Sequence, residues 1–468
     1  MSTTTTATAG IRFARAEQHG VLLGLSGAQL GFVAIALVVA GTAVYLAGAS
    51  GLGLAAAVWG PLLVVGTARI GGRPLTAWLP LLADWQARRV TGRTATVQST
   101  RSPSLVDSLR LPGIAGPLAI ATTPSGTAVV HDRRAGTLTA VARVSSAGFL
   151  LADVAVQDHR VGAWGRVLGS LSQADDVVRL QVLHRSLPAP GASSSLMGLG
   201  EGFAARVLSE LLAQTPADQR ETLVAVSLRA GRSRRGRPDP AHLAQVDESL
   251  MTLARALAGA DLVVAAWLDA AEVRRAVRAS YDPSPAALAP SLVPVASQAG
   301  PMAAREFWDR LECDGAVHAV YWVAEWPRSE VHPGFLQSLA LAPGVRRSVS
   351  LTVEPLTAAA SLRQIRRAKA EHIADSAQRA KLGQVEDESV RAEQADLARR
   401  EAELVAGHGD LRFTGLLTVT AATVEELTAA GSALRSAAAQ AMCEVRRLDG
   451  QHGLAHAAGA LPLARRLL

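Results

Sequence analysis

Two long runs without a charged residue dominate the hydrophobic pattern near the N-terminus. They cover residues 24–48 and 51–68, and only two residues separate them. Each run is long enough to cross a hydrocarbon core of about 30 Å as a helix, for which about 17 to 25 residues suffice. The pattern therefore predicts a transmembrane hairpin over residues 23–70. A pair of buried core helices and a cleaved signal peptide are the alternatives, and both fit two adjacent uncharged runs poorly.

Arginines flank this predicted hairpin at both ends. Arg12 and Arg15 precede it, and five more follow it: Arg69, Arg73, Arg88, Arg89 and Arg93. Basic residues next to membrane spans favour the cytoplasmic side. We therefore expect a two-span protein of the inner (cytoplasmic) membrane with both termini in the cytoplasm, where residues 1–22 form an N-terminal tail.

Residues 73–93 follow with apolar side chains at three- and four-residue spacing: Leu75, Trp78, Leu79, Leu82 and Trp85. This periodicity predicts an amphipathic helix that lies in the membrane interface. Trp78 and Trp85 would then sit among the lipid headgroups, with Arg88 and Arg89 on lipid phosphates. An ordinary core helix is the alternative.

Beyond a Thr-, Ser-, Pro- and Gly-rich linker at 94–125, short apolar runs alternate with helical patterns. The first half, a predicted domain at 126–280, contains expected strands at 128–132, 137–144, 177–183, 221–229 and 262–268 and expected helices at 153–171, 202–214 and 240–258. After a linker at 281–300, the second domain at 301–468 contains expected strands at 317–324, 347–353, 411–420 and 444–448 and expected helices at 334–341, 358–406 and 424–442.

Each half has the order strand-helix-strand, helical insert, strand-helix-strand. This is the split βαβ order of a ferredoxin-like fold with an insert at its middle. We therefore predict an α+β chain with two ferredoxin-like split βαβ units, related by internal duplication, behind an N-terminal two-helix transmembrane hairpin.

Composition adds little chemistry to this picture. The chain carries a net charge of +7, part of which is the arginine group beside the membrane. The two cysteines, Cys313 and Cys443, are far apart in sequence and predict neither a disulfide framework nor a zinc site.

An arginine-rich loop at residues 228–240 is a candidate site for an anionic partner. Its arginines are Arg229, Arg232, Arg234, Arg235 and Arg237. Such a loop could bind nucleic acid or lipid phosphate, but it lacks the aromatic side chains that stack on bases. Nucleic acid is therefore a candidate partner without further support, and a solvated loop is the alternative.

The helical stretch at 358–406 has dense charges of both signs, and Gly383 near its middle would let it fold back as a helical hairpin. We expect either an arm that binds a partner subunit or a solvated structural hairpin.

The sequence shows no recognisable catalytic motif. His131, His159, His332 and His408 are dispersed, without HExxH or another metal-ligand spacing, and no nucleophile elbow or GxGxxG follows a strand. A P-loop needs a lysine directly after a glycine, whereas the only lysines, Lys369 and Lys381, each follow an alanine. We therefore predict no cofactor, no metal and no enzymatic activity, and exclude a P-loop ATPase.

Several blocks resemble a family of actinobacterial integral membrane proteins of about this length. They are WDRLECDGAVHAVYWVAEWPRSEVHPGFL (308–336), LAPGVRRSVSL (341–351), IRRAKAEH, ELVAGHGDLRFTGLLTVTA and the closing ALPLARRL. The N-terminal GVLLGLSGAQLG and GRPLTAWLPLLADW are similar too, so the resemblance covers nearly the whole chain. Members of that family look like a fusion of the two-helix membrane component of conjugative type IV secretion systems with the amino-terminal, non-hydrolytic domain of the partner conjugation ATPase.

The resemblance implies an oligomeric membrane platform that docks a separate cytoplasmic P-loop ATPase, and it carries over no catalytic residue. Membrane lipids and further copies of the chain are the other expected partners. Two alternatives stay open at this point: a membrane component of a type VII secretion system, and a membrane-bound enzyme with an unrecognised site.

Overall fold

The computed structural model describes most of the chain, in eleven segments with a few isolated positions between residues 202 and 210. The segments are 25–97, 108–149, 151–188, 218–231, 233–234, 237–282, 299–327, 329–341, 346–381, 388–406 and 409–467. The predicted tail 1–22 lies outside the described residues, as do most of the predicted helix at 202–214 and most of the linker at 281–300. The chain divides into two compact units, of which the larger contains residues 95–366 and 396–468 and the smaller contains residues 14–94 and 367–395.

In the smaller unit, one helix is long and apolar enough to cross a membrane. The elements of residues 25–94 are α1 (Gly27–Leu54), α2 (Ala56–Thr67), β1 (Arg69–Ile70), β2 (Arg73–Pro74) and α3 (Leu75–Val90). Among the described residues only α1 meets both criteria, and a signal sequence near an N-terminus meets them as well. α2 has 12 residues, about 18 Å at 1.5 Å per residue, so two separate spans are not established by helix length.

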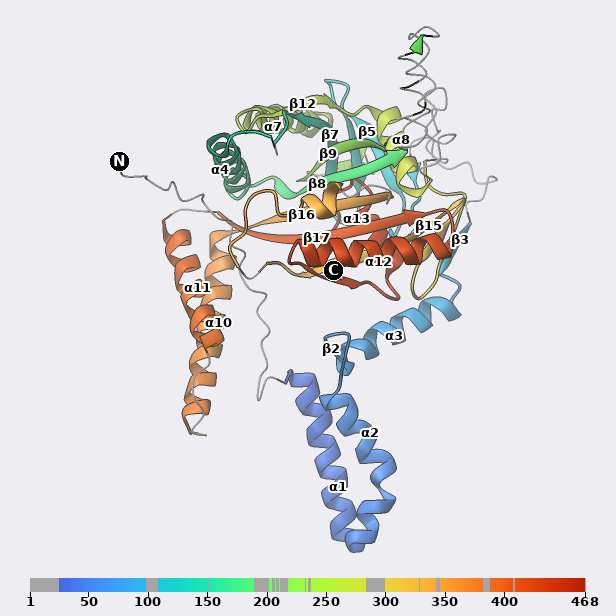
Figure 1. The fold of residues 1–468 in the computed structure, drawn as a ribbon, viewed down its shortest axis with the longest axis vertical. Coiled ribbons are helices and arrows are strands. Elements are labelled where there is room, and N and C mark those ends of the chain that lie inside the picture. The colour runs from blue at the N-terminus through green and yellow to red at the C-terminus, as the bar shows by residue number, and fades with distance from the viewer. Residues whose placement is uncertain are drawn as a thin grey trace. The chain divides into compact units, whose positions relative to one another are not determined.

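The helix labelled α1 contains a break. Ser26 caps its start through a capping box with Gln29, whereas Ala47 and Gly48 have non-helical backbone angles, and Gly48 has φ +60°. This break lies just before the two-residue link that the sequence suggested. α2 packs back against α1 (Figure 1): the Gln29 side chain donates to the Gly66 carbonyl at 3.0 Å.

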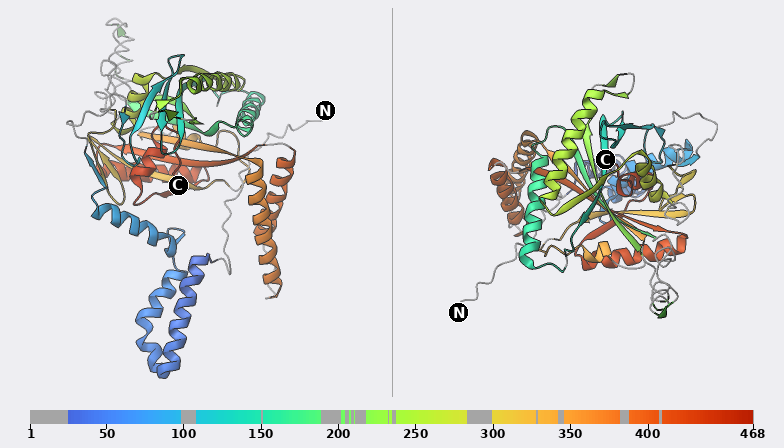
Figure 2. Two further views of the ribbon diagram at one scale, coloured as in Figure 1. Left: turned by 180° about the vertical axis from the view of Figure 1, so that it is seen from behind. Right: turned by 90° about the horizontal axis from the view of Figure 1, so that it is seen from above.

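The larger unit is built on one large, mainly antiparallel sheet (Figures 1 and 2). Its strands, in the order in which they pair, are β3 (Ala95–Val97), β13 (Ala303–Glu306), β14 (Leu311–Cys313), β15 (Ala316–Glu325), β17 (Asp410–Ala421), β16 (Arg346–Leu356), β8 (Val177–Pro188), β9 (Asp218–Arg229), β7 (Thr137–Ser146), β6 (Ala128–Asp132), β5 (Leu118–Thr122) and β4 (Ser108–Leu109). Two further strands pair off this path, β12 (Leu262–Trp267) with β7 and β18 (Glu444–Arg447) with β15.

The two halves of this sheet repeat one arrangement. The first half pairs in the order β12-β7-β9-β8 and the second in the order β18-β15-β17-β16, and every pair is antiparallel. A hairpin joins the first strand of each half, β5-β6 at β7 and β13-β14 at β15. The halves meet where β8 pairs with β16, so strands of both predicted domains lie in one continuous sheet.

The helices of the larger unit occupy corresponding places in the two halves. They are α4 (Val154–Leu171), α7 (Pro240–Ala258) and α8 (Ala270–Tyr281) in the first half, and α9 (Gln337–Leu341), α12 (Val424–Gln440) and α13 (His452–Gly459) in the second. α8 follows β12 as α13 follows β18, which is a further correspondence between the halves.

Alternating residues along the strands build a core on each face of the sheet. In β9, Val224, Val226 and Leu228 pack with α4 and α7, whereas Leu223 and Ala225 pack with α8 and the segment after α13. In the second half, the corresponding cores contain α12 on one face and α13 on the other. This period of two is what a strand buried on both faces requires.

The described parts of the segment predicted as a linker at 94–125, residues 94–97 and 108–125, contribute instead to the sheet and its core. It contains β3, β4 and β5, and the side chains of Leu109, Leu111 and Leu118 are buried. Gly113, at φ +73°, approaches the backbone of Gly453 so closely that a Cβ atom would collide with it. Thr, Ser, Pro and Gly are typical of loops, but here the few aliphatic residues between them enter the core.

Between β16 and β17 the chain forms the two helices α10 (Ala358–Lys381) and α11 (Glu388–Val405), which lie side by side (Figure 1). We call these two helices the helical arm. Gly383, the expected reversal point, lies outside the described residues. At the base of the arm, Ile365 and Leu397 are buried and Arg400 forms an ion pair of 2.7 Å with Asp410.

Candidate functional site

The four residues predicted at the membrane interface lie on α3. Trp78 and Trp85 are seven positions apart, and the Trp78 indole donates to the Ile70 carbonyl at 3.2 Å. The Arg89 guanidinium lies 5.3 Å from the centre of the Trp85 ring, a cation–π distance. Arg88 forms an ion pair of 2.8 Å with Asp84. The last turn of α3 therefore combines an aromatic ring with two cations, and one cation already has a carboxylate partner.

The arginine-rich loop contains a short hairpin. β10 (Ser233–Arg234) and β11 (Arg237–Pro238) pair antiparallel, with Arg234 opposite Arg237 in the backbone register. Arg229 ends β9, while Arg232 and Arg235 lie outside the described residues. A basic hairpin at this position is compatible with an anionic partner and identifies none.

The histidines singled out from the sequence are not assembled into a site. His131 is buried in β6, where burial lowers its pKa, and the neighbouring Asp132 is held by Arg465. His159 is exposed on α4, His332 bonds locally to the backbone of Gly334, and His408 lies outside the described residues. In the described part of the chain, no group of three or more His, Cys, Asp or Glu residues is placed to hold a metal ion.

Three other histidines, which sequence reasoning missed, lie fully buried in the second half of the sheet unit. They are His318 on β15 and His452 and His456 on α13. The rings of His318 and His456 are 4.6 Å apart, and the Tyr281 ring lies 4.8 Å from that of His456. The four-residue spacing of His452 and His456 was the available signal, since it places both on one helix face.

His318 and His456 contact backbone carbonyls at the end of α8, whereas His452 accepts from the Val320 N–H of β15 at 3.3 Å. A His318 ring nitrogen lies 3.1 Å from the Tyr281 carbonyl at the end of α8, and a His456 ring nitrogen lies 3.1 Å from the Ser280 carbonyl. Burial lowers the pKa of His318 to about 4 and that of His452 to about 3, and it holds the pKa of His456 well below its usual range. At neutral pH all three are therefore uncharged.

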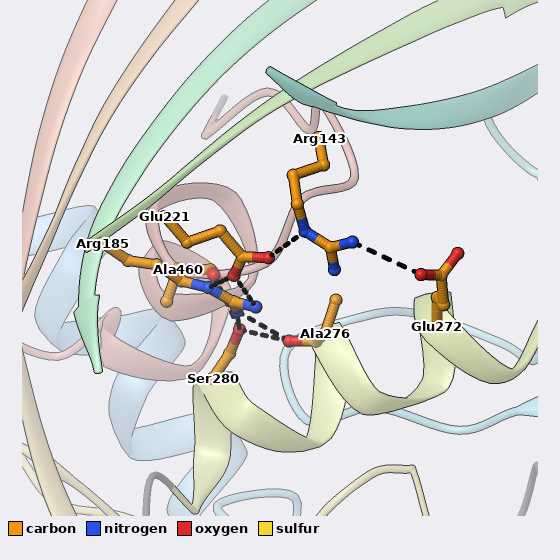
Figure 3. A network of polar contacts seen from close by, with 7 residues as sticks. All are labelled: Arg143, Arg185, Glu221, Glu272, Ala276, Ser280 and Ala460. Carbon is orange, nitrogen blue, oxygen red and sulfur yellow. Dashed lines mark hydrogen bonds and ion pairs between the residues drawn. The ribbon is translucent and has the colours of Figure 1, made fainter. Parts of the chain in front are cut away.

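A buried ion network lies next to them (Figure 3). Glu221 on β9 accepts from Arg143 Nε at 3.0 Å and from Arg185 Nη2 at 2.7 Å. Arg185 also donates to the Ala276 carbonyl of α8 at 2.8 Å, and Arg143 lies 3.3 Å from Glu272, at the start of α8. Burial alone would raise the pKa of Glu221, but Arg185 and Arg143 lower it, so the carboxylate stays ionised.

Gln181 on β8 completes this layer of polar groups. Its amide donates to Ser350 on β16 at 2.9 Å and to the carbonyls of Ala458 and Leu461 at 3.1 Å, and it accepts from the Ala464 N–H at 2.7 Å. We call the buried set Gln181, Arg185, Glu221, Ser280, His318, Ser350 and His456 the polar seam. Backbone carbonyls at helix ends need such donors, so its hydrogen bonds are those of a structural network.

One pocket lies beside the polar seam, between the first half of the sheet and the segment after α13. It is lined by strand residues from β5 to β8 and by Leu463, Arg465 and Arg466. Arg179 of β8 also lines it, and its Nε donates to the Ala464 carbonyl at 2.6 Å. A basic pocket of this kind can hold an anion, and its residues provide no evident nucleophile paired with a base.

Comparison with known proteins gives no assignment. No protein-family model matches the chain, and no curated protein sequence is significantly similar to it.

Proposed function

We propose that this chain is a non-enzymatic, two-span platform of the inner (cytoplasmic) membrane that docks a separate P-loop ATPase of a type IV secretion or conjugation-like system. The observation that carries the proposal is the exposed apolar surface of α1, of whose most apolar stretch only 6% is buried. Its large exposed side chains are Ile35, Leu37, Val38, Val44, Tyr45, Leu46, Leu52 and Leu54. Apolar surface of this extent is stable only against lipid or another protein.

The break in α1 supports two spans. Residues 27–46 form a helix before the break at Ala47 and Gly48, and helical residues 49–67 follow it. Each stretch has about 20 residues, or about 30 Å at 1.5 Å per residue, which matches the hydrocarbon thickness. In this proposal the chain reverses at Ala47–Gly48, on the far side of the membrane.

The repeated strand order supports two ferredoxin-like units. In each half the third strand lies between the first and the second, and the fourth pairs outside the first, as a split βαβ unit requires. We propose that the halves arose by duplication and that β8 and β16 fused them into one sheet. This reading agrees with the resemblance to a conjugation-ATPase amino-terminal domain.

The absence of an enzymatic role is part of the proposal, and the polar seam supports it. Its arginine, glutamate and histidines contact helix ends or one another. Buried polar groups that bond to one another and to the backbone specify and rigidify a fold, which suits a platform. The helical arm carries mixed charges, and among its described residues the buried apolar ones, such as Ile365 and Leu397, lie toward its base. The arm is the proposed ATPase contact.

Cysteine labelling is expected to show both α3 and the sheet unit on the cytoplasmic side. In cells, a membrane-impermeant maleimide should label Ser50→Cys, next to the break, without permeabilisation, and should label Thr91→Cys, after α3, only once the membrane is opened. The natural Cys313 and Cys443 should stay silent because both are buried and burial raises their pKa, that of Cys443 to about 11. Equal labelling of the two positions in intact cells would contradict two spans.

Purification from native membranes in mild detergent is expected to recover a P-loop ATPase in fixed ratio with the tagged chain. Replacing residues 369–395 by a short Gly-Ser linker removes the outer arm but keeps Ile365, Leu397 and the Arg400–Asp410 ion pair. This variant should lose the ATPase while staying in the membrane fraction. The matched control, with Arg234 and Arg237 changed to Gln in the basic hairpin, should retain it.

If the arm variant still recovers the ATPase, the helical arm is not the contact with the ATPase. Recovery of type VII secretion components, or of the protein alone, would overturn the proposed system.

A further inference from the structure

The basic pocket beside the polar seam has a cavity of about 150 Å³. Thr137 and Thr139 of β7 form part of its wall, Arg179 enters from β8, and Arg465 and Arg466 enter from the segment after α13. Arg179 is 15% exposed and Arg466 is 54% exposed. The pocket therefore has one guanidinium in its interior and another at its mouth.

The carboxylates near the pocket do not satisfy these arginines. Asp132 accepts from Arg465 at 2.6 Å and, through its other oxygen, from the backbone N–H groups of Arg134 and Ala135 at 2.9 Å. Both carboxylate oxygens of Asp132 therefore already accept hydrogen bonds, and none of these bonds comes from Arg179 or Arg466.

The second carboxylate, Glu354, is too far away for hydrogen bonds. Its Oε1 lies 3.9 Å from Arg179 Nη1 and 3.9 Å from Arg466 Nε. Among the described residues, the only hydrogen bond of the Arg179 side chain goes to the Ala464 carbonyl. Among the described residues three arginines face two carboxylates there, so this part of the pocket has an excess positive charge and unused N–H donors.

The surroundings make this arrangement costly without an anion. Burial lowers the pKa of Arg179, and the Arg465 and Arg466 cations lower it further, against the opposing effect of Glu354 and Asp132. A buried cation is stabilised when a charged acceptor satisfies its donors.

The size of the cavity limits the ligand. At about 30 Å³ per water molecule, 150 Å³ is the space of about five waters. This accommodates one tetrahedral oxyanion with a small substituent, whereas pockets for larger ligands usually measure about 300 to 1,000 Å³. A whole nucleotide is larger than this cavity and would have to extend beyond its mouth.

We propose that this pocket binds a single phosphate group, either as inorganic phosphate or as the phosphate of a small ester, between Arg179 and Arg466. The planar guanidinium presents N–H pairs that match phosphate oxygens. Because Arg466 belongs to the segment after α13 and Arg179 to β8, the ligand would tie that segment to the first half of the sheet. The proposal does not depend on the membrane role proposed above.

The test is a binding titration of the full-length protein in a sugar-based detergent free of phosphate. Inorganic phosphate and glycerol 3-phosphate are the two probes, titrated by calorimetry against sodium chloride of equal ionic strength. We expect saturable binding of inorganic phosphate, and binding of glycerol 3-phosphate as well if the natural ligand is an ester.

Three arginine variants locate the site. Arg179→Gln and Arg466→Gln are each expected to weaken phosphate binding about tenfold or more, because each removes a cation and its charge-assisted hydrogen bonds to the phosphate. Arg255→Gln, at an exposed position on α7 outside the pocket, should bind phosphate as the unaltered protein does. Because Arg466 is half exposed, its variant will fold even if the Arg179 variant does not.

The proposal is overturned if neither probe binds above the chloride control. It is also overturned if Arg466→Gln and Arg255→Gln bind phosphate equally well.

Discussion

Between pH 7 and pH 4 the free energy of unfolding is expected to fall by roughly 6 kcal/mol or more, because buried histidines must take up protons. His318 has a pKa of about 4 and His452 of about 3 in the folded protein, against about 6.5 in an unfolded chain. A depressed histidine pKa stabilises the fold above pH 6.5, and this contribution is lost as the pH falls toward the folded value. Each of the two accounts for about 3 kcal/mol at pH 4, at 1.36 kcal/mol per pKa unit.

His456 acts in the same direction, since its pKa is also lowered by burial and by the nearby His318. The two rings are 4.6 Å apart, so they will titrate as a coupled pair. Below about pH 4.5 the lowered pKa of Glu221 adds to the loss. Domains of ordinary stability have about 5 to 15 kcal/mol in total, so the sheet unit should unfold near pH 4.

Urea titrations at several pH values between 7 and 4 will measure this slope. His318→Gln removes one titrating group and is expected to make the dependence on pH shallower. His159→Gln, at an exposed position on α4, is the control and should leave the slope unchanged. A free energy of unfolding that stays level from pH 6.5 to pH 4.5 would contradict the structural role of the buried histidines.

Glu221→Ala is expected to destabilise the fold by about 3 to 5 kcal/mol at neutral pH, the usual result of removing one partner of a buried ion pair. The Arg185 side chain is only 4% exposed, so it would keep its charge without the carboxylate that balances it. Arg143 is 43% exposed, so water can solvate its guanidinium in the variant. The loss of stability therefore comes mainly from the buried charge of Arg185.

Two variants separate this effect from a general loss of contacts. Arg185→Met together with Glu221→Leu removes both charges and should cost less than Glu221→Ala alone. Glu444→Ala breaks the exposed Glu444–Arg446 pair and should cost less than about 1 kcal/mol. If denaturant unfolding shows equal losses for Glu221→Ala and Glu444→Ala, the network does not carry the stability assigned to it.

Local patterns predicted much of the fold. The strand at 137–144 corresponds to β7, the helix at 240–258 coincides with α7, and the helical stretch beginning at Ala358 is the start of α10. Each has a clear apolar period and a boundary signal, such as the Asp239 cap before α7. The mixed α+β class followed from the same patterns.

The pairings between distant segments could not be predicted from the sequence. The β8–β16 pairing joins the two halves, and neither strand signals that its partner lies in the other half. The strands β4 and β5 were missed because only Leu109 and Leu118 and their few apolar neighbours enter the core from a polar segment. The polar seam was missed because its members, such as Gln181 and His318, form hydrogen bonds with carbonyl groups at helix ends. Those helix ends are close to them only in the folded protein.

The candidate sites also differ in how far they could be predicted from the sequence. Trp85, Arg88 and Arg89 lie within one turn of α3, so their proximity follows from helical spacing alone. The basic pocket brings together Arg179 and Arg466, which are far apart in the sequence, and no local pattern links them.

The segment after α13 also sets an order of events during synthesis. Ala464 bonds to both Arg179 and Gln181, and Leu461 and Leu463 fill the core of the first half. The ribosome therefore completes β5 to β9 long before the residues that close their core exist. Until then the first half has exposed apolar surface and an unpaired β8 edge, so a chaperone that shields nascent chains is expected to matter more for this protein than for one whose halves fold independently.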